Sequence, residues 1–347
     1  MKKLVLIDGN AILHKGYHAL PPFRTAKGEL VNAVYGFASV LLNLLNEQQP
    51  DFMAVAFDVK GGTFRNEKSV DYKATRTKAP DDLYAQIGRI KDVLAAFKVP
   101  IFEAPGFEAD DVLGTLARQG EARGDIEVLI VTGDLDTLQL VGDRVKVLAL
   151  HRGFSNPIVF DRAAVYERCA LWPRQIADFK GLAGDSSDNI KGVNGIGKKT
   201  AVDLLQKFET LEGIYEAVDG TSAKVDLLRQ DHRSLLTVSD HTPPSVATPF
   251  LASHPFADVP KTISGAVGVK LAAGREDALL SKELASIVCD VPGVNLDLPA
   301  CEVQEYEFDQ VAGLFEELGF RSLMKKLGVF EKRAAEKRNS EVQTSLF

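Results

Sequence analysis

GFEADD, residues 106–111, places Glu108, Asp110 and Asp111 just before an apolar helical pattern that begins at Val112. Acids are common in a first helical turn, because the unpaired backbone amides and the helix dipole favour negative charge there. Helix capping alone is therefore enough to explain this stretch. A functional interpretation requires acids from other parts of the chain to meet these three.

Short apolar runs elsewhere in the chain end at acids, as buried parallel strands leading to a site would. The runs are residues 4–7, 53–57 and 128–131, and the acids that follow them are Asp8, Asp58, Asp134 and Asp136. Parallel strands bring their carboxyl ends to one edge of a sheet, where ligand sites of open α/β sheets lie. We expect these acids to meet the GFEADD acids at that edge.

A further loop, residues 184–189, adds Asp185 and Asp188, which brings the acids to nine. Nine carboxylates in one cleft would repel each other strongly unless cations neutralised them. Sites made only of oxygen ligands select hard ions, so we expect Mg²⁺, with Mn²⁺ as a substitute, rather than zinc. Two such ions about 3.5–4 Å apart form the arrangement that cleaves phosphodiesters by in-line displacement.

Composition is that of an ordinary globular protein: 347 residues, 45% hydrophobic and 26% charged. The start of the chain lacks a signal-peptide core, and no run reaches transmembrane length, so no membrane association and a cytoplasmic location are expected. Three cysteines without C-x-x-C spacing indicate a reducing compartment and neither a disulfide framework nor a zinc site. They are Cys169, Cys289 and Cys301.

The net charge of −7 looks unsuited to nucleic acid, but positive charge is concentrated between residues 60 and 78. The basic residues there are Lys60, Arg65, Lys68, Lys73, Arg76 and Lys78. If residues 72–76 were helical, Lys73 and Arg76 would share a face. A solvated charged helix is the simpler interpretation. We favour a phosphate-gripping segment, with little packing of its own, because it follows Asp58. Lys15, close after Asp8, is a further candidate cation.

Alternating strand and helix patterns predict an α/β fold with a mainly parallel central sheet. Helical spacing is visible over residues 31–45 and 81–97, between the apolar runs. We predict a catalytic domain over 1–180, a helical region over 181–328 and a charged tail over 329–347. Residues 229–267 are rich in proline, serine and threonine and are interpreted as an insertion.

The glycine-rich stretch 192–200 fits three motifs unequally. A Rossmann fingerprint fails on glycine spacing, and a P-loop fails because Lys199 stands at its Ser/Thr position; neither has a strand before it. The third is a hairpin between helices, whose backbone amides would bind phosphates whatever the base sequence. The residues predicted to do so are Gly192, Gly195, Gly197, Lys198, Lys199 and Thr200.

Together these motifs resemble the 5′ nuclease family, which includes the N-terminal 5′→3′ exonuclease domain of bacterial DNA polymerase I and, more distantly, the flap endonucleases. The resemblance covers residues 1–228 and 268–328, and LIDGN, YKATR, GFEADD, TGDLD and GDSSDNIKGVNGIGKKTA occur in the family's order. It implies a PIN-like nuclease fold, a helical arch at about residues 63–90, and a helix-hairpin-helix-type motif at 192–205 with an associated K⁺. No polymerase domain follows, so we expect a freestanding nuclease.

The resemblance also implies roles for single residues. All nine acids match the family's metal-binding acids: Asp8, Asp58, Glu108, Asp110, Asp111, Asp134, Asp136, Asp185 and Asp188. Lys73 and Arg76 match arch residues that engage the scissile phosphate, and with Lys15 they are the predicted catalytic cations. Arg65 and Tyr72 are predicted DNA contacts.

The chain ends in a short peptide that resembles another family feature. Residues 343–347, with Gln343, Leu346 and Phe347, resemble the Gln-x-x-Leu-Phe peptide by which bacterial replication proteins bind the sliding clamp. Chance occurrence is the simpler interpretation of a pentapeptide. Its place at the tip of a polar tail favours a clamp contact.

The function predicted is a Mg²⁺-dependent, structure-specific 5′→3′ exonuclease and flap endonuclease, located in the bacterial cytoplasm with the nucleoid. Its partners would be branched, nicked or flapped DNA, or RNA–DNA hybrids, in replication and repair. A catalytically silent DNA-structure-binding protein recruited to the clamp is the alternative. An RNA-cutting nuclease gives no reason for the hairpin motif, and a small-molecule phosphatase gives none for the basic segment.

Overall fold

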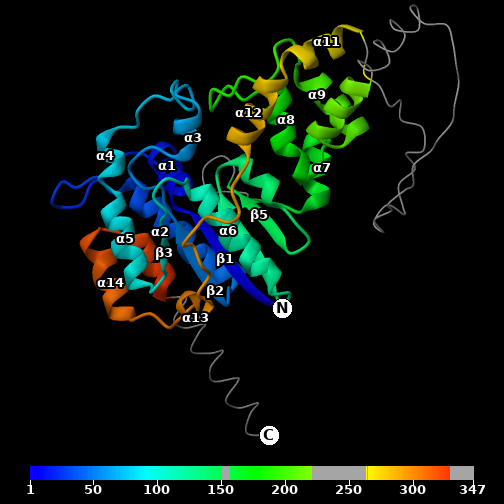
Figure 1. Ribbon diagram of the computed structural model, residues 1–347. Helices are drawn as coiled ribbons and strands as arrows, with labels where there is room; N and C mark the ends of the chain where they lie inside the picture. The colour runs from blue at the N-terminus through cyan, green and yellow to red at the C-terminus, as the bar shows by residue number, and fades with distance from the viewer. Residues whose placement is uncertain (151–156, 221–262, 264, 329–347) are drawn as a thin grey trace, which may run out of the picture. The chain divides into compact units, whose positions relative to one another are not determined.

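The computed structural model describes residues 1–150, 157–220, 263 and 265–328, and it divides into two compact units (Figure 1). Unit 1 comprises Met1–Pro173 and Ile287–Phe347, and unit 2 comprises Arg174–Ser286. The predicted insertion and tail fall almost wholly outside the described residues. Within the described part of the chain, no helix combines the length and apolar character needed to cross a membrane.

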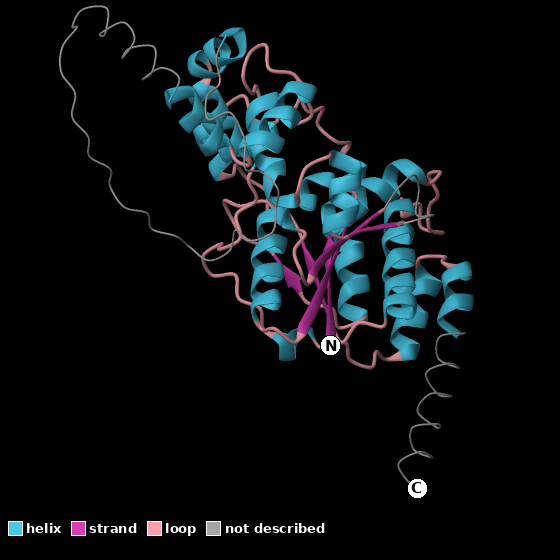
Figure 2. Cartoon of the chain, turned by 90° about the vertical axis from the view of Figure 1, so that its right-hand side faces the viewer, coloured by secondary structure: helices cyan, strands magenta, loops and turns pink. Residues whose placement is uncertain are grey.

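Unit 1 contains a six-stranded sheet in the order β3-β2-β1-β4-β5-β6. The strands are β1 (Lys2–Asp8), β2 (Phe52–Ala56), β3 (Ile101–Phe102), β4 (Ile126–Thr132), β5 (Val145–Ala149) and β6 (Ile158–Phe160). The first five in sequence are parallel and β6 is antiparallel to β5. The predicted mainly parallel α/β sheet is confirmed, and Figure 2 shows it in magenta between helices.

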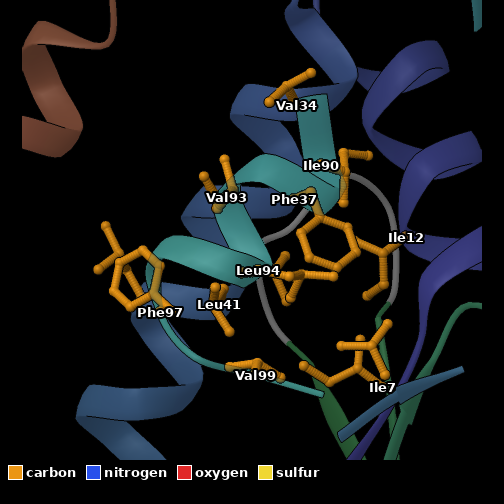
Figure 3. Close-up of a cluster of buried hydrophobic side chains, with 14 of the residues drawn as sticks. Ile7, Ile12, Val34, Phe37, Leu41, Ile90, Val93, Leu94, Phe97 and Val99 are labelled. Atoms are coloured by element: carbon orange, nitrogen blue, oxygen red, sulfur yellow. The ribbon is translucent and has the colours of Figure 1, made fainter. Parts of the chain in front are cut away.

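The sheet lies between helices because its central strands are apolar on both faces. Helices of unit 1 include α1 (Gly9–Ala19), α2 (Asn32–Gln48), α3 (Phe64–Lys68), α4 (Asp81–Tyr84), α5 (Ile87–Ala96), α6 (Ala109–Ala122), the 3₁₀ helix η1 (Leu135–Leu140), α7 (Arg162–Cys169), α13 (Leu298–Cys301) and α14 (Phe308–Glu317). Val5 and Ile7 of β1 join a core with α1, α2 and α5, part of which is drawn in Figure 3. On the other face Leu4 meets α6 near Gly120, where a Cβ would lie 3.2 Å from it.

Unit 2 is helical. It contains η2 (Pro173–Gln175, which spans the boundary), α8 (Ile176–Ala183), α9 (Lys198–Phe208), α11 (Gly265–Ala273) and α12 (Arg275–Ala285). α8 and α12 approach closely at Gly181, where a Cβ would lie 3.0 Å from the backbone oxygen of Ala278. Apolar side chains of α9, Leu204 and Leu205 among them, are buried.

The structure differs from the predicted elements in three places. The single helix predicted over 81–97 is two helices, α4 and α5, separated at residues 85 and 86. The short antiparallel strand β6 has no counterpart in the prediction, because three residues carry too little periodicity. The predicted division at 180 gave residues 287–328 to the helical region, whereas they belong to unit 1. The reason is burial: Phe315 of α14 packs on Phe97 beside α5.

Replacing Phe315 tests this division. Phe315→Ala should lower the free energy of unfolding by about 3–5 kcal/mol, because the side chain is fully buried and its loss leaves a cavity. The neighbouring, exposed Glu316→Ala should change it by less than about 0.5 kcal/mol. Urea unfolding of both variants measures the difference. Equal losses would contradict the packing of α14 in the core of unit 1.

Candidate functional site

The topology creates a switch point at β1, whose neighbours β2 and β4 lie on opposite sides of it. Crevices at such points, at the carboxyl ends of the strands, are where α/β sheets place ligands. Asp8 ends β1 there, and it is only 4% exposed. Its Oδ2 accepts a 2.7 Å hydrogen bond from Thr132 Oγ1 at the end of β4, and its Oδ1 accepts one of 2.9 Å from the Ala11 amide. Asp8 therefore joins β1 to β4 and caps α1.

Asp58 brings the GFEADD helix to the same edge. It follows β2, and its Oδ1 accepts a 2.7 Å hydrogen bond from the Ala109 amide in the first turn of α6. The unpaired amides at a helix start favour this negative charge. The contact fixes Glu108 and Asp110, which flank Ala109, beside the ends of β1 and β2.

Repulsion among these acids is visible in their pKa values. Burial raises the pKa of Asp8 to about 7, with the charges of Asp58 and Asp134 adding to the rise and the hydrogen bonds from Ala11 and Thr132 opposing it. Burial also raises the pKa of Asp110 well above its ordinary value, and Asp8 and Asp134 add to it, while the Lys73 ammonium opposes it. Asp8, Asp58, Asp110 and Asp134 thus share one electrostatic environment.

This group fits a divalent cation by the chemistry of its donors: carboxylate oxygens that a hard cation would neutralise. In the part of the chain that is described, no three acid, imidazole or thiol side chains already converge as the ligands of one ion. Asp134 caps η1, where its Oδ1 accepts a hydrogen bond of 2.9 Å from the Asp136 amide, and Asp136 lies in the first turn of η1. The metal-ligand assignments remain predictions.

Lys73 and Tyr72 of the basic segment both contact Glu108. Lys73 Nζ lies 2.8 Å from Glu108 Oε2, and the Tyr72 hydroxyl donates to the same oxygen at 3.3 Å. Residues 70–75 form turns, and Lys73 has a positive φ of 56°, so the helical pairing of Lys73 with Arg76 that the sequence suggested is not found. Arg76 is exposed.

Two predicted DNA contacts have buried positions, and the predicted cation Lys15 has a backbone partner. Arg65 is buried and pairs with Asp111, and Tyr72 is only 4% exposed, so both placements disagree with a surface contact to DNA. Lys15 Nζ donates a 2.6 Å hydrogen bond to the Leu150 backbone oxygen, which ties α1 to the end of β5. Burial lowers the pKa of Lys15. The expectation that the basic segment has little packing is wrong, because Arg65 and Tyr72 are both buried.

Asp185 and Asp188 belong to unit 2. Lys180 Nζ lies 2.5 Å from Asp185 Oδ2, and Ser187 donates to Oδ1 from both its amide and its hydroxyl. Burial alone would raise the pKa of Asp185, but these contacts outweigh it and hold the pKa at about 2. Asp188 is buried. Both acids therefore lie in one ordered loop, and their part in a metal site stays a prediction.

The glycine-rich stretch is a hairpin between α8 and α9. Gly192 and Gly195 have positive φ, which suits glycine. Gly192 packs so tightly on the backbone of Gly184 that no side chain could be added, and its amide donates to Ser281 Oγ at 3.0 Å. Gly197 precedes α9, which starts with the exposed Lys198 and Lys199, followed by the half-buried Thr200. The element before this loop is the helix α8 and not a strand, which agrees with the rejection of the Rossmann and P-loop motifs.

Sequence reasoning missed some residues that organise the site. Thr132 holds Asp8 across the switch point, and the Asn10 side chain accepts a 3.1 Å hydrogen bond from the Asp58 amide. Both stand next to predicted acids: Asn10 two positions after Asp8, Thr132 two before Asp134. Polar residues beside an acid at a strand end are the signal that could have identified them.

A family model described as "5'-3' exonuclease, N-terminal resolvase-like domain" matches residues 3–170, and one described as "5'-3' exonuclease, C-terminal SAM fold" matches residues 171–241. The chain belongs to the 5′–3′ exonuclease family. The resemblance found in the sequence is confirmed, and with it membership in a family of hydrolases.

The relatives found by sequence are longer proteins. DNA polymerase I of Caldicellulosiruptor bescii is 36% identical over 331 residues, covering 95% of this chain and 34% of the relative. DNA polymerase I of Bacillus subtilis is 36% identical over 94% of this chain and 32% of its own length. The chain thus spans about a third of the relatives that it matches.

A solved nuclease structure is similar in fold to this chain. The flap endonuclease of bacteriophage T5, in a pseudo-enzyme-product complex with DNA and metal ions, is 19% identical with a TM-score of 0.57. The match covers 92% of this chain and all of the T5 chain. At this identity the likeness confirms the nuclease fold alone.

Removing one crowded carboxylate should stabilise the protein when divalent ions are chelated. At about pH 8, Asp110→Asn should raise the free energy of unfolding, because the raised pKa of Asp110 means that its charged form is less favourable folded than unfolded. The gain should be mostly lost near about pH 4, where the carboxyl group is neutral in the folded state and about half ionised in the unfolded state. Urea unfolding in EDTA at both pH values tests this, with the exposed Asp203→Asn as control. A loss of stability at the higher pH would contradict the repulsion.

Proposed function

We propose that this family member is a Mg²⁺-dependent, structure-specific 5′→3′ exonuclease and flap endonuclease. One observation supports it above the others: acids from the ends of β1, β2 and β4 and from the start of α6 share one electrostatic environment at the switch point of the sheet. The charges involved are those of Asp8, Asp58, Asp110 and Asp134. Such a group of buried like charges lowers the stability of the fold unless bound cations neutralise it.

Glu108, Asp110, Asp8 and Asp134 would hold the divalent ions, with Asp58 fixing the start of α6. Bound ions would activate a water and neutralise the leaving 3′ oxygen. Lys73 now lies on Glu108, so its ammonium is within side-chain reach of a phosphate at the acids. There it would stabilise charge on the phosphoryl oxygens, with Arg76 as a second, exposed cation.

The substrate we propose is flapped or nicked DNA, in replication and repair. The chain's exposed Lys198 and Lys199 lie at the start of α9, where backbone amides and the helix dipole favour a phosphate. Such a contact positions the backbone without reading bases. The DNA in the solved T5 complex is consistent with this choice. We also propose that K⁺ binds at the hairpin and that flaps containing RNA are substrates.

Cleavage of a 5′-labelled flap duplex with and without Mg²⁺ tests the chemistry. Wild-type protein should cut near the flap junction only with Mg²⁺, and Asp134→Ala should lower kcat by at least about 100-fold, because a charge-neutralising ligand is lost. DNA affinity, measured by fluorescence anisotropy in Ca²⁺, should change by less than about threefold in this variant. Asp203→Asn, at an exposed position of unit 2, is the control. Near-normal turnover by Asp134→Ala would contradict the assignment. Binding by the wild type without any cutting would instead favour a silent DNA-structure-binding protein.

We also propose that the C-terminal peptide binds the bacterial sliding clamp. Gln343, Leu346 and Phe347 lie outside the described residues, so this proposal rests on the sequence pattern alone. Deleting residues 343–347 should abolish clamp binding in a pull-down, because these side chains would supply the contact. Cleavage of free flaps should be unchanged. Undiminished clamp binding by the truncated protein would refute the proposal.

A further inference from the structure

Asp111 differs from the other GFEADD acids in its surroundings. Its side chain is completely buried, and both oxygens are paired with the guanidinium of Arg65. The two N–O distances, from NH1 to Oδ2 and from NH2 to Oδ1, are both 2.7 Å. This is the parallel two-bond geometry that makes arginine–carboxylate pairs strong and directional.

Two backbone amides complete the set of donors to this carboxylate. The Glu108 amide donates to Oδ2 at 3.0 Å, and the Val288 amide donates to Oδ1 at 2.8 Å. An ionised carboxylate offers about four lone-pair positions. Four donors therefore occupy the acceptor capacity of Asp111, and a cation would have to displace one of them.

The Val288 contact is part of a longer seam along α6. Asp111, Thr115 and Gln119 are spaced by four residues, so they lie on one face of the helix. Thr115 Oγ1 accepts from the Val291 amide at 3.1 Å, and Gln119 Oε1 accepts from the Leu296 amide at 2.7 Å. The segment 287–296 therefore runs along α6, with Gly114 allowing the close approach of Ile287.

Arg65 connects this seam to the basic segment. It belongs to α3, it is only 2% exposed, and its NH1 also lies 3.8 Å from Glu108 Oε2. The same Glu108 oxygen contacts Lys73 at 2.8 Å. Through Arg65, the buried carboxylate of Asp111 thus holds α3, the start of α6 and the segment 287–296 together.

We propose that Arg65 and Asp111 are positioning residues of the nuclease site, rather than a DNA contact and a metal ligand. The pair fixes Glu108 at the start of α6, and it holds α3, which precedes Lys73 in the chain, against α6. The orientation of Glu108, Asp110 and Lys73 toward a substrate then depends on it. This inference rests on the proposed metal-dependent nuclease function.

Mn²⁺ binding in the absence of DNA, measured by electron paramagnetic resonance, tests whether Asp111 is a metal ligand. Asp110→Asn should weaken binding by at least about 10-fold, as expected for a ligand. Asp111→Asn, which keeps the size of the side chain, and Arg65→Gln should weaken it to the same extent, because each breaks the pair that orients Glu108 and Asp110. Loss of binding in Asp111→Asn with binding by Arg65→Gln unchanged would mark Asp111 as a ligand and overturn the inference. Arg89→Gln, which removes another two-bond arginine pair of unit 1, is the matched control and should change neither binding nor turnover.

The positioning part is tested by turnover and by amide hydrogen exchange in metal-free protein. Arg65→Gln and Asp111→Asn should each lower kcat on the flap duplex, and the double variant, which restores an uncharged hydrogen-bonded pair, should be no worse than the poorer single variant. Amides of residues 64–68 and 287–288 should exchange at least about 10-fold faster in both single variants, whereas those of α14 should not. Multiplying losses in the double variant, or unchanged exchange, would overturn the inference.

The two readouts separate this inference from the proposed function. If the wild type bound no Mn²⁺ and cut no flap, the metal-dependent function would fail. Hydrogen exchange in the metal-free protein would still decide whether Arg65 and Asp111 position the start of α6.

Discussion

Repulsion between carboxylates that have been removed from water is the constraint around which unit 1 is built. Asp8 and Asp110 have raised pKa values because burial disfavours their charged forms and their acidic neighbours add to the effect. Left to itself, such a group would push the strand ends apart. The fold holds it together by parallel strand pairing on either side of β1 and by the apolar packing of both faces of the sheet.

Local contacts offset part of this cost. Thr132, Ala11 and Ala109 donate hydrogen bonds to Asp8 and Asp58, and Lys73 places a positive charge against Glu108. Hydrogen bonds to a charged group are among the stronger ones in proteins. They are directional, so they also fix where each carboxylate lies. In the proposed function, the remaining repulsion would give the site its affinity for divalent cations, at the expense of some stability.

The two units differ in the interactions that shape their predicted functional residues. Unit 1 concentrates negative charge at a sheet edge, whereas unit 2 uses close backbone packing at Gly184 and Gly192 to form a hairpin before α9. Unit 2 also neutralises its own acid, since Lys180 and Ser187 hold the pKa of Asp185 at about 2. The chain re-enters unit 1 at residue 287 and then runs along α6. There, side chains of α6 rather than a neighbouring strand accept the hydrogen bonds of its backbone amides.

The central strands, their parallel direction and the acids that follow them could be predicted from the sequence, because short apolar runs followed by Asp are a local pattern. The family could be recognised for the same reason. What only the tertiary structure decided is which partners each acid has. Asp110 and Asp111 are adjacent and chemically identical, but successive helical residues point about 100° apart. Packing of α6 turns Asp110 toward Asp8 and Asp134 and turns Asp111 inward to Arg65. No local pattern records that rotation, because it is set by contacts with residues 46 and 177 positions away in the chain.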